Sequence, residues 1–146
     1  MKIQKLLEAL NELLEPGKNF ETTVPTACRF RAKKEVKNIV CGVSASEALI
    51  NEAVKRDADT IIVHHGYFWK NENPRIIGIK RTRIKKLLEH DINLIAYHLP
   101  LDANEKVGNN HELGRLLKFK RCNTLPDEPL VLQGEFDPPV TIAKTH

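Results

Sequence analysis

Hydrophobic residues in the first part of the chain follow two periods, which predict its secondary structure. Between residues 3 and 14 they recur every three or four positions and so lie on one face of a helix. Glu15, Pro16 and Gly17 predict the end of that helix. Short apolar runs typical of buried strands follow at 38–43, 60–63 and 92–97. The pattern predicts one helix followed by three strands.

Helical patterns separate these three apolar runs. Ser44 followed by Glu47 has the spacing of a capping box, which predicts a helix that continues through Val54. A second helical pattern covers 79–88. Because strands and helices alternate, we predict an α/β fold, a three-layer domain with a largely parallel central sheet.

The pattern weakens toward the C-terminus. Asn109 with Glu112 three residues later predicts another helix start, and residues 130–132 form one short apolar run. We therefore predict an α/β domain at residues 1–121, followed at 122–146 by the start of a truncated second unit. In this interpretation the second domain is mostly missing.

Composition narrows the class of protein. The chain has 146 residues, 41% of them hydrophobic and 29% charged, which is ordinary for one globular domain. It has neither an apolar signal segment nor a run of about 18 apolar residues, so we expect no membrane partner. Its three cysteines lack C-x-x-C spacing, which predicts no disulfide framework and a cytoplasmic location.

Two surface features have competing interpretations. The net charge of +4 is mild, and the basic run Lys80–Lys86 favours the solvated face of an amphipathic helix over a nucleic-acid-binding surface. The aromatic residues Tyr67, Phe68 and Trp69 could stack on a substrate base or pack in the core. Neither a G-x-S-x-G motif nor a P-loop is present, so nucleophilic catalysis has no sequence support.

Four residues with metal-ligating side chains follow two of the predicted strands. His64 and His65 come directly after the second apolar run, and His98 and Asp102 follow the third. The carboxyl ends of parallel strands meet at one edge of a sheet, where ligands bind. Imidazole nitrogen and carboxylate oxygen are ligands for Zn, Fe, Mn, Ni or Co. This placement predicts a metal site.

Each of these residues also has a structural interpretation. Taken alone, His98 could be a hydrogen-bonded strand-end residue, the histidine pair could stack or cap, and Asp102 could cap a turn or helix. Adjacent side chains of a strand point to opposite faces, so His64 and His65 reach one site only if the backbone turns. Gly66 permits that turn.

Several motifs together resemble a known family. They are Val43-Ser44-Ala45-Ser46, Ile62-Val63-His64-His65-Gly66-Tyr67-Phe68-Trp69, His98-Leu99-Pro100-Leu101-Asp102-Ala103 and Gly108-Asn109-Asn110. They resemble the successive motifs of the YbgI-like dinuclear metal proteins, also called GTP cyclohydrolase I type 2 homologues. The resemblance covers most of the chain.

The resemblance implies a cytoplasmic protein of two α/β domains, assembled as a toroidal homohexamer with two divalent metal ions per subunit. The family's paired histidines and its aspartate fall on His64, His65 and Asp102, with His98 as the candidate catalytic residue that orients a ligand or water. The implied activity is metal-dependent hydrolysis of a purine nucleotide. The alternative is a non-enzymatic metal-binding or regulatory protein that acts through the ring.

The chain departs from the family pattern in two places. A C-terminal motif that supplies a histidine and a glutamate has no counterpart, which predicts a truncated chain. At Thr22–Ala32 the family has a segment like Asp-Tyr-Cys-Pro-Asn-Gly-Leu-Gln-Val-Gln-Gly. DNA for that segment, read one nucleotide later, encodes every residue of Thr22–Ala32. We therefore predict compensating frame changes there, and an uncompensated one before Lys144-Thr145-His146.

Overall fold

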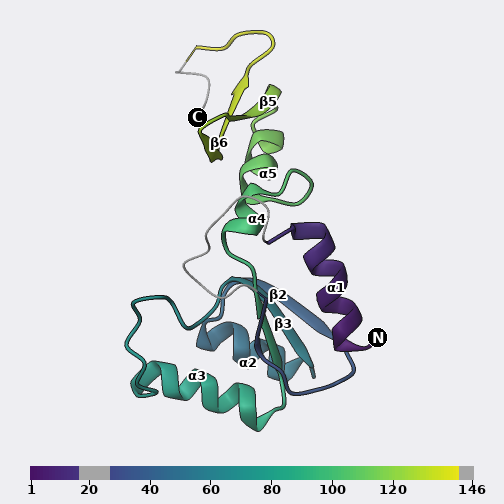
Figure 1. Ribbon diagram of the computed structural model, residues 1–146, viewed down its shortest axis with the longest axis vertical. Helices are drawn as coiled ribbons and strands as arrows, with labels where there is room; N and C mark the ends of the chain where they lie inside the picture. The colour runs from purple at the N-terminus through teal and green to yellow at the C-terminus, as the bar shows by residue number, and fades with distance from the viewer. Residues whose placement is uncertain (17–26, 142–146) are drawn as a thin grey trace. The chain divides into compact units, whose positions relative to one another are not determined.

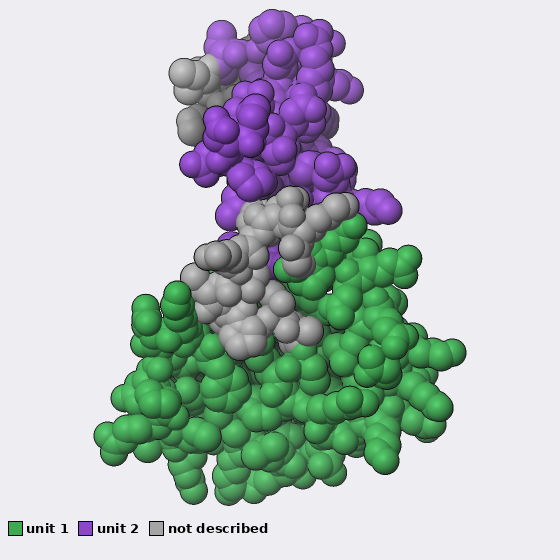
Figure 2. Space-filling model, in the orientation of Figure 1, with its two compact units in different colours: residues 1–98 green, residues 99–146 purple. Residues whose placement is uncertain are grey.

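The computed structural model describes residues 1–16 and 27–141. The chain divides into two compact units, Met1–His98 and Leu99–His146, which Figure 2 shows in different colours. Residues 22–26 and 144–146, which carry part of the reading-frame prediction, lie outside the described residues.

A sheet in the order β1-β4-β3-β2 forms the centre of the first unit. Strands β2 (Ile39–Ser44), β3 (Thr60–His65) and β4 (Asn93–Ala96) are parallel, as predicted. Strand β1 (Ala27–Phe30) pairs antiparallel with β4 and was not predicted. It has only four residues and contains an arginine, so it lacks the alternation that marks a strand.

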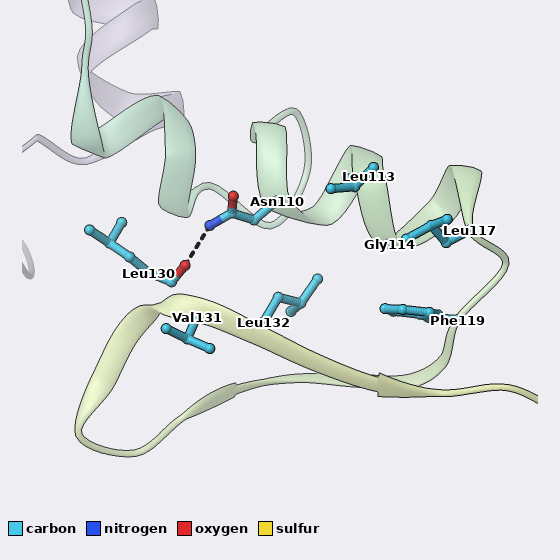
Figure 3. Close-up of a pocket in the computed structure, with 8 residues that line it drawn as sticks. All are labelled: Asn110, Leu113, Gly114, Leu117, Phe119, Leu130, Val131 and Leu132. Atoms are coloured by element: carbon cyan, nitrogen blue, oxygen red, sulfur yellow. Dashed lines mark hydrogen bonds between the residues drawn. The ribbon is translucent and has the colours of Figure 1, made fainter. Parts of the chain in front are cut away.

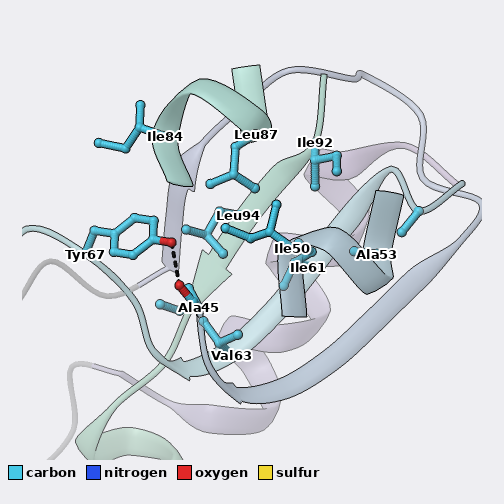
Figure 4. Packing of buried hydrophobic residues seen from close by; sticks show 12 residues of the cluster. Ala45, Ile50, Ala53, Ile61, Val63, Tyr67, Ile84, Leu87, Ile92 and Leu94 are labelled. Carbon is cyan, nitrogen blue, oxygen red and sulfur yellow. Dashed lines mark hydrogen bonds between the residues drawn. The ribbon is translucent and has the colours of Figure 1, made fainter. Parts of the chain in front are cut away.

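Three helices cover the sheet of the first unit. Helices α2 (Glu47–Lys55) and α3 (Gly78–Glu89) bury Ile50, Ala53, Ile84 and Leu87 against it (Figure 4). Helix α1 (Ile3–Leu14) lies on the other side (Figure 1). The helices therefore sandwich the sheet in the predicted three layers.

Helix α2 begins two residues later than the capping-box pattern predicts. Its N-cap is Ser46, whose side chain accepts a hydrogen bond from the backbone N–H of Leu49 at 3.2 Å. The prediction of a cap at Ser44 was wrong because β2 continues to Ser44, which is paired with His65 of β3. That pairing makes the Ser44 side chain a neighbour of a candidate ligand.

Buried polar groups join the amino ends of the parallel strands. The side chain of Asn93 on β4 is fully buried, and its amide donates to the backbone carbonyl of Asp59 at 3.1 Å and to the Thr60 hydroxyl at 3.2 Å. Its carbonyl oxygen accepts from the backbone N–H of Ala32 at 2.8 Å. The Asp59 carboxylate in turn accepts from two backbone N–H groups, at Lys37 and the next residue.

The second unit consists of two helices and a hairpin. Helices α4 (Leu99–Ala103) and α5 (Asn109–Leu116) are followed by β5 (Lys120–Leu125), paired antiparallel with β6 (Glu128–Glu135). The sequence predicted a boundary after residue 121, whereas the structure divides after His98.

Contacts between α5 and the hairpin explain this division. The Asn110 side chain donates to the backbone carbonyl of Leu130 at 2.7 Å. A Cβ on Gly114 would lie 3.0 Å from Leu132. Helix α5 therefore packs with the strands that follow it. Its N-cap is Gly108, so the predicted cap Asn109 is instead the first helical residue.

Two predictions from the sequence, on membrane-spanning segments and on disulfides, can be compared with the described residues. None of the helices in 1–16 and 27–141 is long and apolar enough to cross a membrane. Cys28, Cys41 and Cys122 are free cysteines.

Candidate metal centre

Three histidines meet at the carboxyl end of the sheet. His64 and His65 are the last residues of β3, and His98 follows β4 by two residues. The ring centres of His64 and His65 are 4.4 Å apart, and those of His64 and His98 are 4.7 Å apart. One potential ligand nitrogen from each ring lies within 4.8 Å of the others. The structure thus brings together the histidines predicted from the two strand ends.

This donor set fits a transition-metal ion. Two imidazole nitrogens bound at about 2.1 Å to one ion lie at most about 4.2 Å apart. The rings therefore need only a small closing movement from separations of up to 4.8 Å. His64 is buried and the other two histidines are half-buried, so the cluster is partly shielded from bulk water.

Ser44 orients the ring of His65. Its Oγ lies 3.0 Å from the Nδ1 of His65, across the last pair of the β2·β3 ladder. In the tautomer whose Nδ1–H donates a hydrogen bond to Oγ, Nε2 carries no proton, and its lone pair is available to bind a metal. The sequence pattern missed this contact because it assigned Ser44 to a helix cap.

Gly66 provides room rather than an unusual backbone angle. Its φ is not in the left-handed region, which among the glycines of the described ranges is found only at Gly78. A Cβ on Gly66 would lie 2.6 Å from the Cβ of Ala96 on β4. The two strand ends that carry the histidines can approach this closely because residue 66 has no side chain.

Trp69 closes one side of the histidine cluster. Its ring centre lies 5.0 Å from that of His98 and 6.1 Å from that of His65. The Glu72 carboxylate holds the Trp69 backbone in place, accepting its N–H at 3.0 Å, and forms an ion pair with Lys80 at 3.1 Å. A loop held by one carboxylate therefore positions an indole beside the candidate ligands.

The negative charge on Glu72 contributes to the contacts that hold the Trp69 loop. Burial raises the pKa of Glu72, but hydrogen bonds from Lys80 and from the backbone N–H groups of Trp69 and Phe68 outweigh burial. The net pKa lies below the ordinary value, so the carboxylate is ionised at neutral pH. In the sequence, Glu72 is simply a glutamate three residues after a tryptophan. This spacing is too common to predict the contact.

The other sequence features have structural roles in the described part of the chain. Tyr67 packs in the core and its hydroxyl donates to the carbonyl of Ala45 (Figure 4). In the basic run, Lys86 donates to Glu47 at 2.7 Å, which ties α3 to α2. These contacts favour the core interpretation for Tyr67 and the helix-surface interpretation for the lysines.

Asp102 belongs to the second unit. It lies on α4, and its carboxylate accepts a hydrogen bond from the side chain of Asn109 at 2.8 Å. The group of three clustered donors in the described ranges consists of the histidines of the first unit. Metal ligation by Asp102 stays a prediction.

The second unit has an apolar hollow, which differs in character from the polar histidine cluster of the first unit. It has a volume of about 260 Å³ and lies between α5 and β6 (Figure 3). Its lining is apolar apart from one amide and consists of Asn110, Leu113, Gly114, Leu117, Phe119, Leu130, Val131 and Leu132. This hollow has no charged or metal-ligating side chain, so the candidate chemistry lies with the histidines.

Comparison with known proteins gives a family for this chain. Residues 1–145 match the family model described as Duf34/NIF3 (NGG1p interacting factor 3). A relative from Escherichia coli, named GTP cyclohydrolase 1 type 2 homolog, is 46% identical over 140 residues. The match covers 96% of this chain and 56% of the relative, so the chain spans about half the length of the curated relatives it matches.

Solved structures agree with the fold. A structure described as protein ybgI, of unknown function, has a TM-score of 0.87 and 47% identity, over 92% of this chain and 53% of that one. A Thermus thermophilus protein has a TM-score of 0.80 and 33% identity, over 86% of this chain and 52% of that one. Both structures extend well beyond the part that is similar to this chain.

Proposed function

This chain belongs to the Duf34/NIF3 family, and from that premise we propose that it binds divalent metal through His64, His65 and His98. We further propose that this site is part of a metal-dependent hydrolase of a purine nucleotide. The observation that carries the proposal is the convergence of three imidazoles from the ends of two adjacent parallel strands. The purine nucleotide is suggested by the name of the relatives, GTP cyclohydrolase 1 type 2 homolog.

The chemistry of the proposed site follows from its donors. Bound divalent ions lower the pKa of coordinated water, which makes hydroxide available near neutral pH. Ser44 fixes the ring of His65, and Trp69 restricts access to the cluster from one side. The family resemblance adds Asp102 as a further candidate metal ligand and a homohexamer as the functional assembly, and we carry both as proposals.

Metal binding without turnover is the second candidate. The clustered donors in the described residues are three histidines, and the chain spans 56% of the Escherichia coli relative. A site with few protein ligands can bind a metal and still lack the groups that a reaction needs. In this case the chain acts as a metal-binding or regulatory protein.

Cobalt titration tests the metal site. We expect the wild-type chain to bind Co²⁺ with visible absorption bands from imidazole coordination, and His64→Ala and His98→Ala to lower the affinity by at least about tenfold. His90→Ala is the matched control, because His90 is exposed at the end of α3. Circular dichroism of each variant checks that the fold is retained. Equal Co²⁺ affinity in all four proteins would contradict the proposed site.

Activity separates the two candidate functions. The metal-loaded wild-type chain is incubated with GTP, and product is measured by chromatography. Turnover that disappears in folded His98→Ala supports the hydrolase. Metal binding with no turnover supports the second candidate.

A further inference from the structure

Trp69 lies outside the hydrophobic core of the first unit. For the aromatic residues at 67–69, the sequence left open whether they pack in the core or stack on a substrate base. Among the described residues, Tyr67 belongs to the buried core cluster. Trp69 belongs neither to that cluster nor to the partly buried residues packed against it. Core packing therefore explains the position of Tyr67 but not that of Trp69.

Trp69 lies beside the more exposed part of the histidine cluster. His64 is buried, whereas His65 and His98 are half-buried and so reach the surface. The ring centres of these two histidines are the ones that lie 6.1 and 5.0 Å from that of Trp69. The indole is itself half-buried. A ligand that reaches a metal at the cluster past its more exposed rings therefore meets the indole.

The loop that carries Trp69 has an unfavourable backbone conformation that its neighbours fix. Phe68 has a φ of 69°, in the left-handed region that bulky residues rarely adopt. The Glu72 carboxylate accepts the backbone N–H of Phe68 at 2.7 Å as well as that of Trp69. Lys80, only 13% exposed, pairs with Glu72, donates to the carbonyl of Asn73 at 3.0 Å and lies 5.1 Å from the centre of the Phe68 ring. Such conformations persist only where the surroundings fix them, and they concentrate at ligand-binding sites.

We propose that Trp69 stacks on the purine base of the ligand that binds at the histidine cluster, with Glu72 as the residue that positions it. The inference rests on the proposed function, which supplies the purine nucleotide, and it adds that the base rather than the phosphates lies at the cluster. Stacking on an aromatic side chain is a common way for proteins to bind a base, because every base has a flat π face. The charge of Lys80 is already balanced by Glu72, so this side of the cluster offers a ring rather than a free cation.

Tryptophan fluorescence tests this proposal on the full chain, because Trp69 is its only tryptophan. The protein is loaded with Zn²⁺, which is redox-inactive, and titrated with the Mg²⁺ complexes of GTP and of inorganic triphosphate. Triphosphate has the same phosphate groups but no base. We expect GTP to quench the emission of Trp69 and triphosphate to leave it unchanged.

Substitutions at residue 69 test whether the aromatic face is what binds. Trp69→Ala is expected to weaken GTP binding by about tenfold, measured by calorimetry. Trp69→Phe is the conservative control, because it keeps an aromatic face and should retain the wild-type affinity within about threefold. Cobalt titration of both variants is expected to match the wild type, since each keeps the three histidines, and circular dichroism checks that each is folded.

The outcomes separate this inference from the proposed function. Equal quenching by GTP and triphosphate, or equal GTP affinity in the wild type and Trp69→Ala, would overturn the role of Trp69 even if GTP is turned over. Trp69→Phe that binds GTP as weakly as Trp69→Ala would overturn stacking as its cause. Binding of GTP that depends on Trp69 but leads to no turnover would support this inference and contradict the hydrolase. Absence of GTP binding in all three proteins would overturn the purine ligand in both.

Discussion

The two units of this chain bury their apolar residues to very different extents. In the first unit, Leu87, Leu94 and Ile61 are fully buried between the sheet and two helices. In the second unit, the leucines of α5 are exposed, with 78% of Leu116 and 56% of Leu113 open to solvent. The first unit therefore has a core of its own, while the second has mainly a hairpin packed on one helix. Pairing between neighbouring strands can form a β-hairpin without burying enough apolar side chains to make a hydrophobic core.

The largest expected effect compares two helical leucines. Leu87→Ala, in the core of the first unit, is expected to lower the free energy of unfolding by about 2–5 kcal/mol, because it leaves a cavity. Leu116→Ala, on α5, should change it by less than about 0.5 kcal/mol, because the side chain is exposed. Urea denaturation measures both values. Equal losses would mean that the leucine of α5 is also part of a core.

Two glycines sharpen the comparison at the level of packing. Gly66→Ala is expected to cost about 1–3 kcal/mol, because its Cβ would lie 2.6 Å from a Cβ fixed on β4. Gly114→Ala in α5 should be neutral or stabilising, because the end of the Leu132 side chain can move away and alanine favours a helix. Thermal melts of the two variants test this difference.

The partner of Gly66 provides an internal check. In Ala96→Gly the opposing Cβ is absent, so adding Gly66→Ala should cost less than it does in the wild type. An unchanged cost would show that close approach of the strands is not the reason for a glycine at residue 66.

The smallest expected effect comes from comparing two carboxylates, Asp59 in the first unit and Glu112 in the second. Burial raises the pKa of Asp59, but hydrogen bonds from the backbone N–H groups of Asn38 and Lys37 and from the Thr60 hydroxyl outweigh it. The folded-state pKa therefore lies below the unfolded value, and the resulting stability is present above the unfolded pKa of about 3.9. It is lost as the pH falls through the folded pKa.

Substitution makes this pH dependence measurable. Asp59→Asn is expected to lower stability at pH 7 by about 1–2 kcal/mol, and the difference from the wild type should shrink as the pH falls below about 4. Glu112→Gln, at an exposed ion pair with Arg115 on α5, should have no resolvable effect at either pH. A difference for Asp59→Asn that does not depend on pH would show that the carboxylate's charge is not what stabilises the fold.

The sequence predicted the elements that have a clear period and the residues at their ends. Strands β2, β3 and β4 were predicted because they are continuous apolar runs, and the histidines of the cluster were predicted because they follow those runs. Strand β1 and the partner of β6 were missed, because their residues show no regular alternation and depend on pairing with a distant or adjacent strand.

The site residues that were missed act through contacts between distant segments. Ser44 meets His65 only because β2 and β3 pair in one register. A local pattern cannot show such contacts. It assigned Ser44 to the nearest motif it fitted, the capping box.

The amide of Asn93 also affects the far end of the sheet. Each strand residue spans about 3.3 Å along the strand, so a slip of one residue between β3 and β4 would shift His98 by that distance relative to His64. Such a slip would also separate the buried Asn93 side chain from Asp59 and Thr60 and leave polar groups unsatisfied. The spacing of the imidazoles therefore depends on the strand register that Asn93 fixes at the opposite end of β3 and β4. Mutations at Asn93 should alter metal affinity even though Asn93 is not itself a metal ligand.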